Sequence, residues 1–194
     1  MVATLLVTGT GLTTASVVPY IKDIIRGKTK PRIVSWAIWT VLLGIAATVS
    51  FQERQMASAV LATSSAIACF TISLLALKHV EWGITRLERI TMLGAAIGLV
   101  LWVVFDDPML VLASTITVDA IAYIPTFKNG WSNPHHESLM MFAISALGGG
   151  LVLLSAILDH ASIHGIAYPL YSLVFAMIMS GILVWRRREQ VRYT

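Results

Sequence analysis

Long apolar runs separated by short charged connections limit the folds open to this chain more than any other feature of its sequence. Seven such runs cover approximately residues 2–22, 33–51, 56–77, 88–105, 108–127, 137–158 and 166–185. Each approaches the ~20 apolar residues that a helix needs to cross a bilayer. Of the 194 residues, 57% are hydrophobic and only 12% are charged, whereas soluble domains carry about 25% charged residues. We therefore predict an all-α integral membrane protein with seven transmembrane helices and the lipid bilayer as its solvent.

The basic residues predict the orientation of these helices. When the connections are assigned alternately to the two sides, Arg54 is the only one of the 14 Lys and Arg residues that does not fall on the side of the C-terminus. Basic loops stay cytoplasmic, so the N-terminus is expected outside and the C-terminus in the cytoplasm of a bacterial inner membrane or plasma membrane. The N-terminal run lacks the basic start of a cleavable signal and is expected to be retained as a helix. Topology and anionic headgroups account for the net charge of +4, and no nucleic-acid partner is expected.

An internal repeat connects the first and fifth runs. The segment Pro19-Tyr20-Ile21-Lys22 is matched 106 residues later by Pro125-Thr126-Phe127-Lys128. Each segment is followed by a second proline, Pro31 or Pro134, and a serine four residues after it. We expect the second prolines to begin helices, with Asn133 capping the later one. Pro19 and Pro125 lie inside runs, where a missing N–H bends a helix, and they are predicted to be hinges.

The repeat predicts the domain organisation. The second copy begins four spans after the first, so both copies have the same orientation in the membrane. The prediction is one membrane domain of two parallel three-helix units, residues 1–77 and 106–187, joined by a linker helix within 78–105 and followed by a cytoplasmic tail, 188–194. Parallel repeats with a site between them near the bilayer midplane form a plan typical of transporters.

This arrangement resembles the PQ-loop superfamily, which includes the SWEET sugar transporters. The resemblance lies in the three, one and three spans, the outside N-terminus, and a proline near the inner end of the first and fifth helices. Tyr20 and Thr126 stand where that family has a glutamine, so the chain resembles a divergent member. The resemblance implies transport of a small solute by alternating access, with Pro19 and Pro125 as hinge prolines.

Asp119 is the main candidate site residue because it is the only carboxylate well inside a run. A charge there costs ~2.5–3.5 kcal/mol on insertion scales, so it should face the protein interior or water. Thr115 and Tyr123 lie four residues before and after it on the same helix face. Thr13 is its counterpart in the first run, since both lie six residues before the proline. This set is predicted to bind a proton, a cation or a small polar solute such as a sugar, amino acid or nucleoside. The alternative is a protonated aspartic acid that holds two helices together.

The tryptophans divide into two groups. Trp39 lies one turn deeper in its run than Trp36 and is expected to line a pocket, where an aromatic wall stacks on a solute. An interfacial belt near the cytoplasmic face accounts for Trp36, Trp82, Trp131 and Trp185.

Metal, cofactor and enzymatic functions are not expected. Cys69 is the single cysteine, and His135 and His136 are adjacent, unlike the i, i+4 spacing of helical zinc ligands. His160 and His164 have that spacing but lie in a short outer loop. The sequence contains no HExxH, GxSxG or paired intramembrane aspartates, and its seventh run has no lysine for a retinal Schiff base.

Two functions remain open from the sequence. The first is a small-solute transporter that works by alternating access between the two units and is proton-coupled through Asp119. The second is a non-transporting membrane receptor or scaffold with the same fold. A homo-oligomer also stays open, because a single Gly94-xxx-Gly98 motif is weak evidence for dimerisation.

Overall fold

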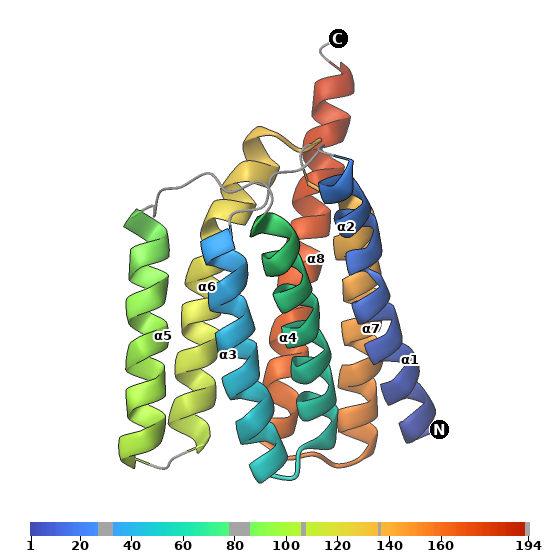
Figure 1. Cartoon of the computed structure of the whole chain (residues 1–194). Coiled ribbons are helices and arrows are strands. Elements are labelled where there is room, and N and C mark those ends of the chain that lie inside the picture. Colours follow the sequence, from blue (N-terminus) through green and yellow to red (C-terminus); the bar gives the residue numbers. More distant parts are fainter. Residues whose placement is uncertain (27–32, 78–85, 106–107, 136, 193–194) are drawn as a thin grey trace.

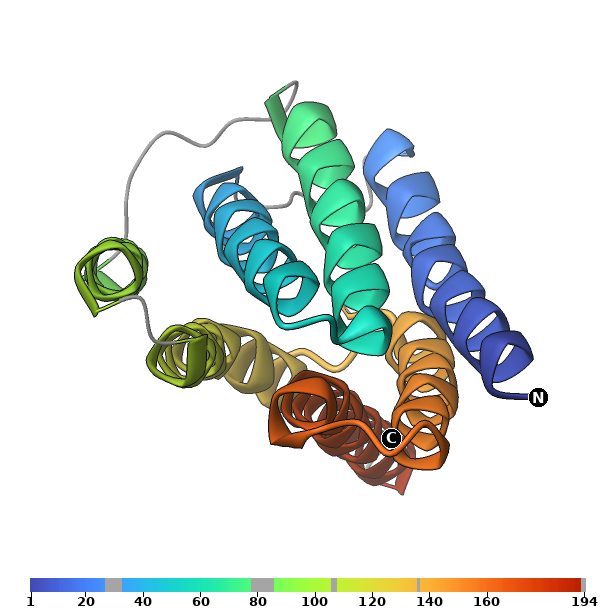
Figure 2. The same ribbon diagram turned by 90° about the horizontal axis from the view of Figure 1, so that it is seen from below.

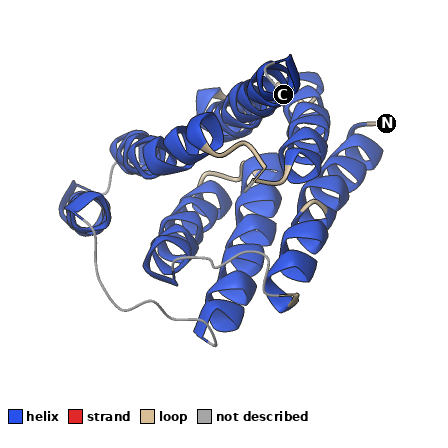
Figure 3. Cartoon of the chain, turned by 90° about the horizontal axis from the view of Figure 1, so that it is seen from above, coloured by secondary structure: helices blue, strands red, loops and turns tan. Residues whose placement is uncertain are grey.

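The chain folds into a bundle of helices in the computed structural model, which describes residues 1–26, 33–77, 86–105, 108–135 and 137–192 (Figure 1). All regular secondary structure in these segments is helical (Figure 3). The helices are α1 (Val2–Ala15), α2 (Val17–Ile25), α3 (Ile33–Gln52), α4 (Met56–Ala76), α5 (Arg86–Phe105), α6 (Pro108–Ser132), α7 (Leu139–Leu158) and α8 (Ile163–Arg192). Each of the seven apolar runs falls on a helix, and the first run is divided between α1 and α2.

Length and composition make the chain an integral membrane protein. Among the described segments, four stretches are long and apolar enough to cross a bilayer: Val2–Ile25, Met56–Ala76, Leu139–Leu158 and Ile163–Gln190. The stretch Trp36–Gln52 in α3 is a shorter apolar helix. Many large apolar side chains of these helices are exposed, as expected where lipid rather than water covers the surface.

The helices pack in a defined set of pairs. The most extensive contacts join α3 with α4, α1 with α7, α7 with α8, and α5 with α6. Between these pairs, α6 also packs on α8 and α3, and α4 packs on α8 and α1. The view along the bundle shows α5 at its edge, beside α6 (Figure 2). The two termini lie at opposite ends of the bundle (Figure 1).

The first apolar run is interrupted one turn before Pro19. Helix α1 ends at Ala15 and α2 begins at Val17. Proline has no N–H to donate to the carbonyl four residues earlier, and for Pro19 that carbonyl belongs to Ala15. The hydroxyl of Ser16, at the break, bonds to the carbonyl of Thr13 at 2.6 Å and lies 2.7 Å from the hydroxyl of Ser145 on α7.

The corresponding region of the second copy is built differently. Helix α6 continues through Pro125 to Ser132, and the side chain of Pro125 lies outside the described part of the chain. The prediction that Pro134 begins the next helix is wrong, because α7 begins at Leu139 with Ser138 as its N-cap. The hydroxyl oxygen of Ser138 accepts the N–H of Met141 at 3.3 Å, which supplies the side-chain cap that was expected from Asn133.

The connection between α6 and α7 is fixed by an arginine of α8. Arg187 donates from Nε to the carbonyl of Pro134 at 3.0 Å and from Nη2 to the carbonyl of Glu137 at 2.7 Å. These two carbonyls therefore serve a contact with α8, and this is the physical reason that Pro134 lies in a connection rather than in a helix.

Two helix-to-helix turns have the same backbone geometry. Arg54, between α3 and α4, has a φ of 57°, and His160, between α7 and α8, has a φ of 53°. In each turn the next residue donates its N–H to the carbonyl five residues back, which is the Schellman pattern that ends a helix. These bonds run from Gln55 to Ser50 at 2.8 Å and from Ala161 to Ala156 at 3.0 Å. The two turns are 106 residues apart, which is the spacing of the paired prolines.

Candidate functional site

The candidate site is centred on Asp119, in the middle of α6. Its side chain is buried, with 7% of the residue exposed. Oxygen Oδ2 accepts a hydrogen bond from the hydroxyl of Tyr171 on α8. Among the described side chains, no Lys, Arg or His forms an ion pair with Asp119, and the ion pairs that are seen join His164 with Glu53 and Arg186 with Glu189. The carboxyl group is therefore paired with a neutral hydroxyl.

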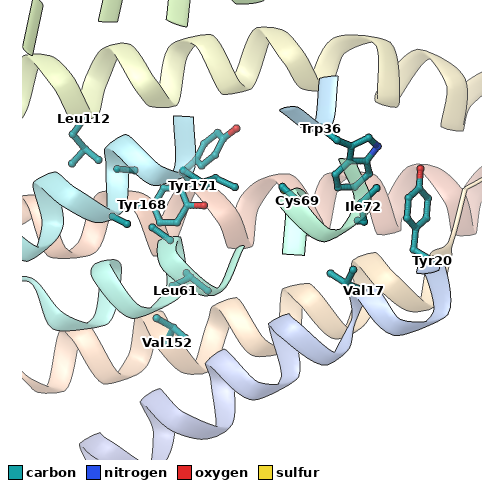
Figure 4. Packing of buried hydrophobic residues seen from close by; sticks show 14 of the residues in the cluster. Val17, Tyr20, Trp36, Leu61, Cys69, Ile72, Leu112, Val152, Tyr168 and Tyr171 are labelled. Atoms are coloured by element: carbon teal, nitrogen blue, oxygen red, sulfur yellow. The ribbon is translucent and has the colours of Figure 1, made fainter. Parts of the chain in front are cut away.

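Tyr171 belongs to a continuous set of aromatic rings from four helices. We call them the aromatic cluster; its members are Tyr20 on α2, Trp36 and Trp39 on α3, Tyr123 and Phe127 on α6, and Tyr168, Tyr171 and Phe175 on α8. Tyr171 lies 4.5 Å from Phe175 between ring centroids, and Phe175 lies 5.2 Å from Tyr123. Figure 4 shows Tyr168 and Tyr171 in the buried core, with Tyr20 and Trp36 farther along the bundle.

One ring contact crosses between helices of the two predicted units. Trp39 on α3 and Tyr123 on α6 have ring centroids 5.4 Å apart. Trp39 is in turn 5.0 Å from Trp36, which continues the cluster towards Tyr20 at 5.3 Å. The aromatic cluster thus runs without a gap from α2 and α3 to α6 and α8.

The indole nitrogen of Trp39 is a buried donor without a described hydrogen-bond partner. Buried N–H groups almost always have a partner, and leaving one unpaired costs about 1–3 kcal/mol. In the described part of the chain, only one other buried side-chain atom is in this position, the hydroxyl oxygen of Thr10. The aromatic cluster that contains Tyr171, the partner of Asp119, therefore also contains an unpaired donor.

The structure brings together some of the residues predicted for the site and separates others. Asp119, Tyr123 and Trp39 meet through the aromatic cluster, whereas the side chain of Thr115 lies outside the described residues. Thr13 lies in the interface between α1 and α7, where its hydroxyl donates to the carbonyl of Gly9 at 3.0 Å. No described contact joins Thr13 to Asp119.

Sequence reasoning missed the contribution of α8. Tyr171, which binds Asp119, and its neighbours Tyr168 and Phe175 were not selected as site residues. A usable signal was present, because two tyrosines flank Pro169 inside an otherwise apolar run. Polar groups and prolines inside a span are unusual and mark functional or packing contacts.

The other candidates lie at the ends of the bundle. His164 forms an ion pair with Glu53 at 3.5 Å, and His136 and Trp82 lie outside the described residues. Trp131 packs edge-on against Trp185 at 5.0 Å, and the guanidinium of Arg186 lies 5.1 Å from the Trp131 ring centre. In the described part of the chain, no group of three or more His, Cys, Asp or Glu residues could hold a metal ion.

Comparisons with known proteins give no match. No family model, curated protein or solved structure is similar to this chain. The residues of the chain itself are therefore the basis for assigning its function.

Proposed function

We propose that the chain is a small-solute membrane transporter that works by alternating access, with Asp119 at the centre of its binding site. The observation that carries this proposal is the position of Asp119, buried in a membrane bundle and bonded only to a neutral tyrosine among the described side chains. An ionisable group at such a place is costly to keep and is typical of substrate, ion or proton pathways.

The packing of the helices supports an arrangement of two three-helix units. The proposed units are α1 to α4 and α6 to α8, with α5 as the linker. Within the first unit, α4 packs on α3 and on α1. Within the second unit, α8 packs on α7 and on α6 in the equivalent way. Between the units, the first helix of each unit packs on the middle helix of the other, so α1 contacts α7 and α6 contacts α3. The last helices of the two units, α4 and α8, contact each other. Exchanging the two units therefore reproduces these contacts, whereas a further contact between α4 and α7 has no α3–α8 counterpart of similar extent.

The paired turns support the same arrangement independently. Arg54 and His160 have left-handed backbone conformations at equivalent positions of two turns, 106 residues apart. A left-handed conformation is uncommon for residues other than glycine, so its recurrence at the spacing of Pro19 and Pro125 favours an internal repeat. With the resemblance to the PQ-loop superfamily, this leads us to propose seven spans, an outside N-terminus and a cytoplasmic C-terminus in a bacterial inner membrane or plasma membrane.

The position of the aromatic cluster fits such a transporter. Trp39 and Tyr123 meet where the two proposed units meet, so a relative movement of the units would change the packing of the aromatic cluster that contains Tyr171, the partner of Asp119. A proton on Asp119 would neutralise the carboxyl group when no solute is bound, and this gives the site a route to proton coupling.

The proposal is tested by uptake into proteoliposomes. Purified protein is assayed against a panel of sugars, amino acids, nucleosides and organic amines, with and without a pH gradient. Wild type is compared with Asp119→Asn and with Asp159→Asn, which removes a carboxylate from the turn between α7 and α8. We expect saturable flux that Asp119→Asn abolishes and Asp159→Asn leaves unchanged. Folded protein without flux for any solute would contradict the proposal and favour a receptor or scaffold.

A further inference from the structure

We propose that the transported solute is a small organic cation of the substituted-ammonium class, with a hydroxyl or other acceptor oxygen near the charged group. This inference rests on the proposed function and narrows its substrate class. It is drawn from three properties of the core: the charge of Asp119, the chemistry of the surrounding rings and the unpaired donor of Trp39.

A positively charged partner would stabilise the buried carboxylate of Asp119. Asp119 is buried and forms no ion pair with a described side chain. The tyrosine hydroxyl that binds Oδ2 supplies a hydrogen bond but no charge. A buried charge is stabilised only when it is paired, so a solute that enters with a positive charge is favoured over a neutral or anionic solute of the same shape.

The surroundings favour an organic cation over a divalent metal ion. Calcium and magnesium take about six or more oxygen ligands, mainly carboxylates, carbonyls and water. The described residues offer no cluster of acidic, histidine or cysteine side chains for such an ion. The carboxyl group is instead bonded to Tyr171, whose ring packs on Phe175, and Phe175 packs on Tyr123. Aromatic faces attract cations with apolar surfaces, and quaternary ammonium groups are the characteristic case.

The indole of Trp39 adds a requirement for an acceptor. Its N–H is buried without a described partner, although the ring is within the same cluster as Tyr123. A solute that carries a hydroxyl, ether or carbonyl oxygen would satisfy this donor on binding. A site with an unpaired polar group discriminates strongly in favour of ligands that pair it.

Isosteric probes test this inference without a change to the protein. Choline has a quaternary ammonium group and a hydroxyl, and it does not cross lipid bilayers freely. 3,3-Dimethylbutan-1-ol has the same shape and hydroxyl but no charge. Propyltrimethylammonium has the charge but carries a methyl group in place of the hydroxyl. Uptake of labelled choline is measured in proteoliposomes, and the two analogues are added as competitors.

We expect saturable choline uptake and a loss of at least about tenfold in competition when the charge is removed. Asp119→Asn should abolish choline uptake, while Asp159→Asn should leave it unchanged. Removal of the hydroxyl should weaken competition by about threefold to tenfold in the wild type. That difference should shrink in Trp39→Phe, which keeps an aromatic ring but has no N–H.

The outcomes separate this inference from the proposed function. Equal competition by choline and its neutral isostere would overturn the inference. Carriage of a sugar or an anionic solute with no response to choline would also overturn it, but would leave the transporter proposal standing. Absence of flux for choline and for every other solute of the panel, in folded protein, would overturn both.

Discussion

Ser58 on α4 donates its hydroxyl proton to the backbone carbonyl of Gly165 on α8, at 2.7 Å and away from solvent. Pro169 lies inside α8 and has no N–H for the carbonyl four residues earlier. That carbonyl is the one of Gly165, so the serine replaces the hydrogen bond that the proline removes. In a membrane each unpaired backbone group is costly, and this contact joins the two proposed units.

Ser58→Ala should destabilise the protein by about 1–3 kcal/mol, because it leaves the carbonyl of Gly165 buried and unpaired. The free energy of unfolding can be measured in mixed micelles by titration with a denaturing detergent. Ser64→Ala is the matched control on the same helix, since Ser64 bonds to the carbonyl of Leu61 within its own helix. Pro169→Ala restores an N–H at position 169, so Ser58→Ala should cost less in that background. An equal cost in both backgrounds would contradict this role for Ser58.

Gly9 and Gly148 lie where the backbones of α1 and α7 approach each other closely. A Cβ added to Gly9 would lie 2.6 Å from the carbonyl oxygen of Gly148, and a Cβ added to Gly148 would meet Thr13 and the backbone of Gly9. Gly9→Ala and Gly148→Ala should each destabilise the protein by about 1–3 kcal/mol or more, because backbone must move to make room.

The matched control for this prediction is Gly11→Ala, two residues along α1. A Cβ at Gly11 would have no described atom within 4 Å, and alanine favours a helix by up to about 1 kcal/mol over glycine. Gly11→Ala should therefore be neutral or stabilising. Equal losses of thermal stability in Gly9→Ala and Gly11→Ala would show that helix packing is not the cause.

Because the indole N–H of Trp39 is unpaired, Trp39→Phe and Trp36→Phe should rank differently in their effects on stability and on transport. The ring of Trp36, three residues earlier, packs on Tyr20 at 5.3 Å between ring centroids, whereas the buried nitrogen of Trp39 has no described partner. Trp39→Phe removes a donor that makes no hydrogen bond, so Trp36→Phe should cost at least as much unfolding free energy as Trp39→Phe. Trp39→Phe should be the more damaging of the two in the uptake assay. If Trp39→Phe destabilises the protein more than Trp36→Phe, the indole of Trp39 is not an unpaired donor in the resting protein.

The helices were predictable from the sequence because a chain segment in lipid must form its backbone hydrogen bonds without water. Each apolar run that lipid must surround becomes a helix, since only helices satisfy every backbone group within a single segment. The burial of Asp119 was predictable for the same reason, because a lone carboxylate in a span must turn inward.

The partners of these residues were not predictable by the same argument. Tyr171 lies 52 residues beyond Asp119, and the contact depends on how α8 rotates against α6. The hydrogen bond of Ser58 to Gly165 likewise depends on how α4 packs against α8, and the pattern of apolar residues in the sequence does not reveal that packing. Pro134 was placed at a helix start because proline suits that position, but Arg187, more than fifty residues later, binds the carbonyls of this segment as part of a connection.

A reversible crosslink between the two units tests alternating access most directly. Glu53 and His164 form an ion pair at 3.5 Å where the turn after α3 meets the start of α8. Both are replaced by cysteine in a Cys69→Ala background and joined by a short bismaleimide linker with a cleavable disulfide. The control pair, Trp131→Cys with Trp185→Cys, joins α6 to α8 within one unit. Crosslinking at 53 and 164 should stop solute flux, reduction should restore it, and the crosslinked control pair should continue to transport. Undiminished flux through protein fully crosslinked at 53 and 164 would contradict transport by relative movement of the two units.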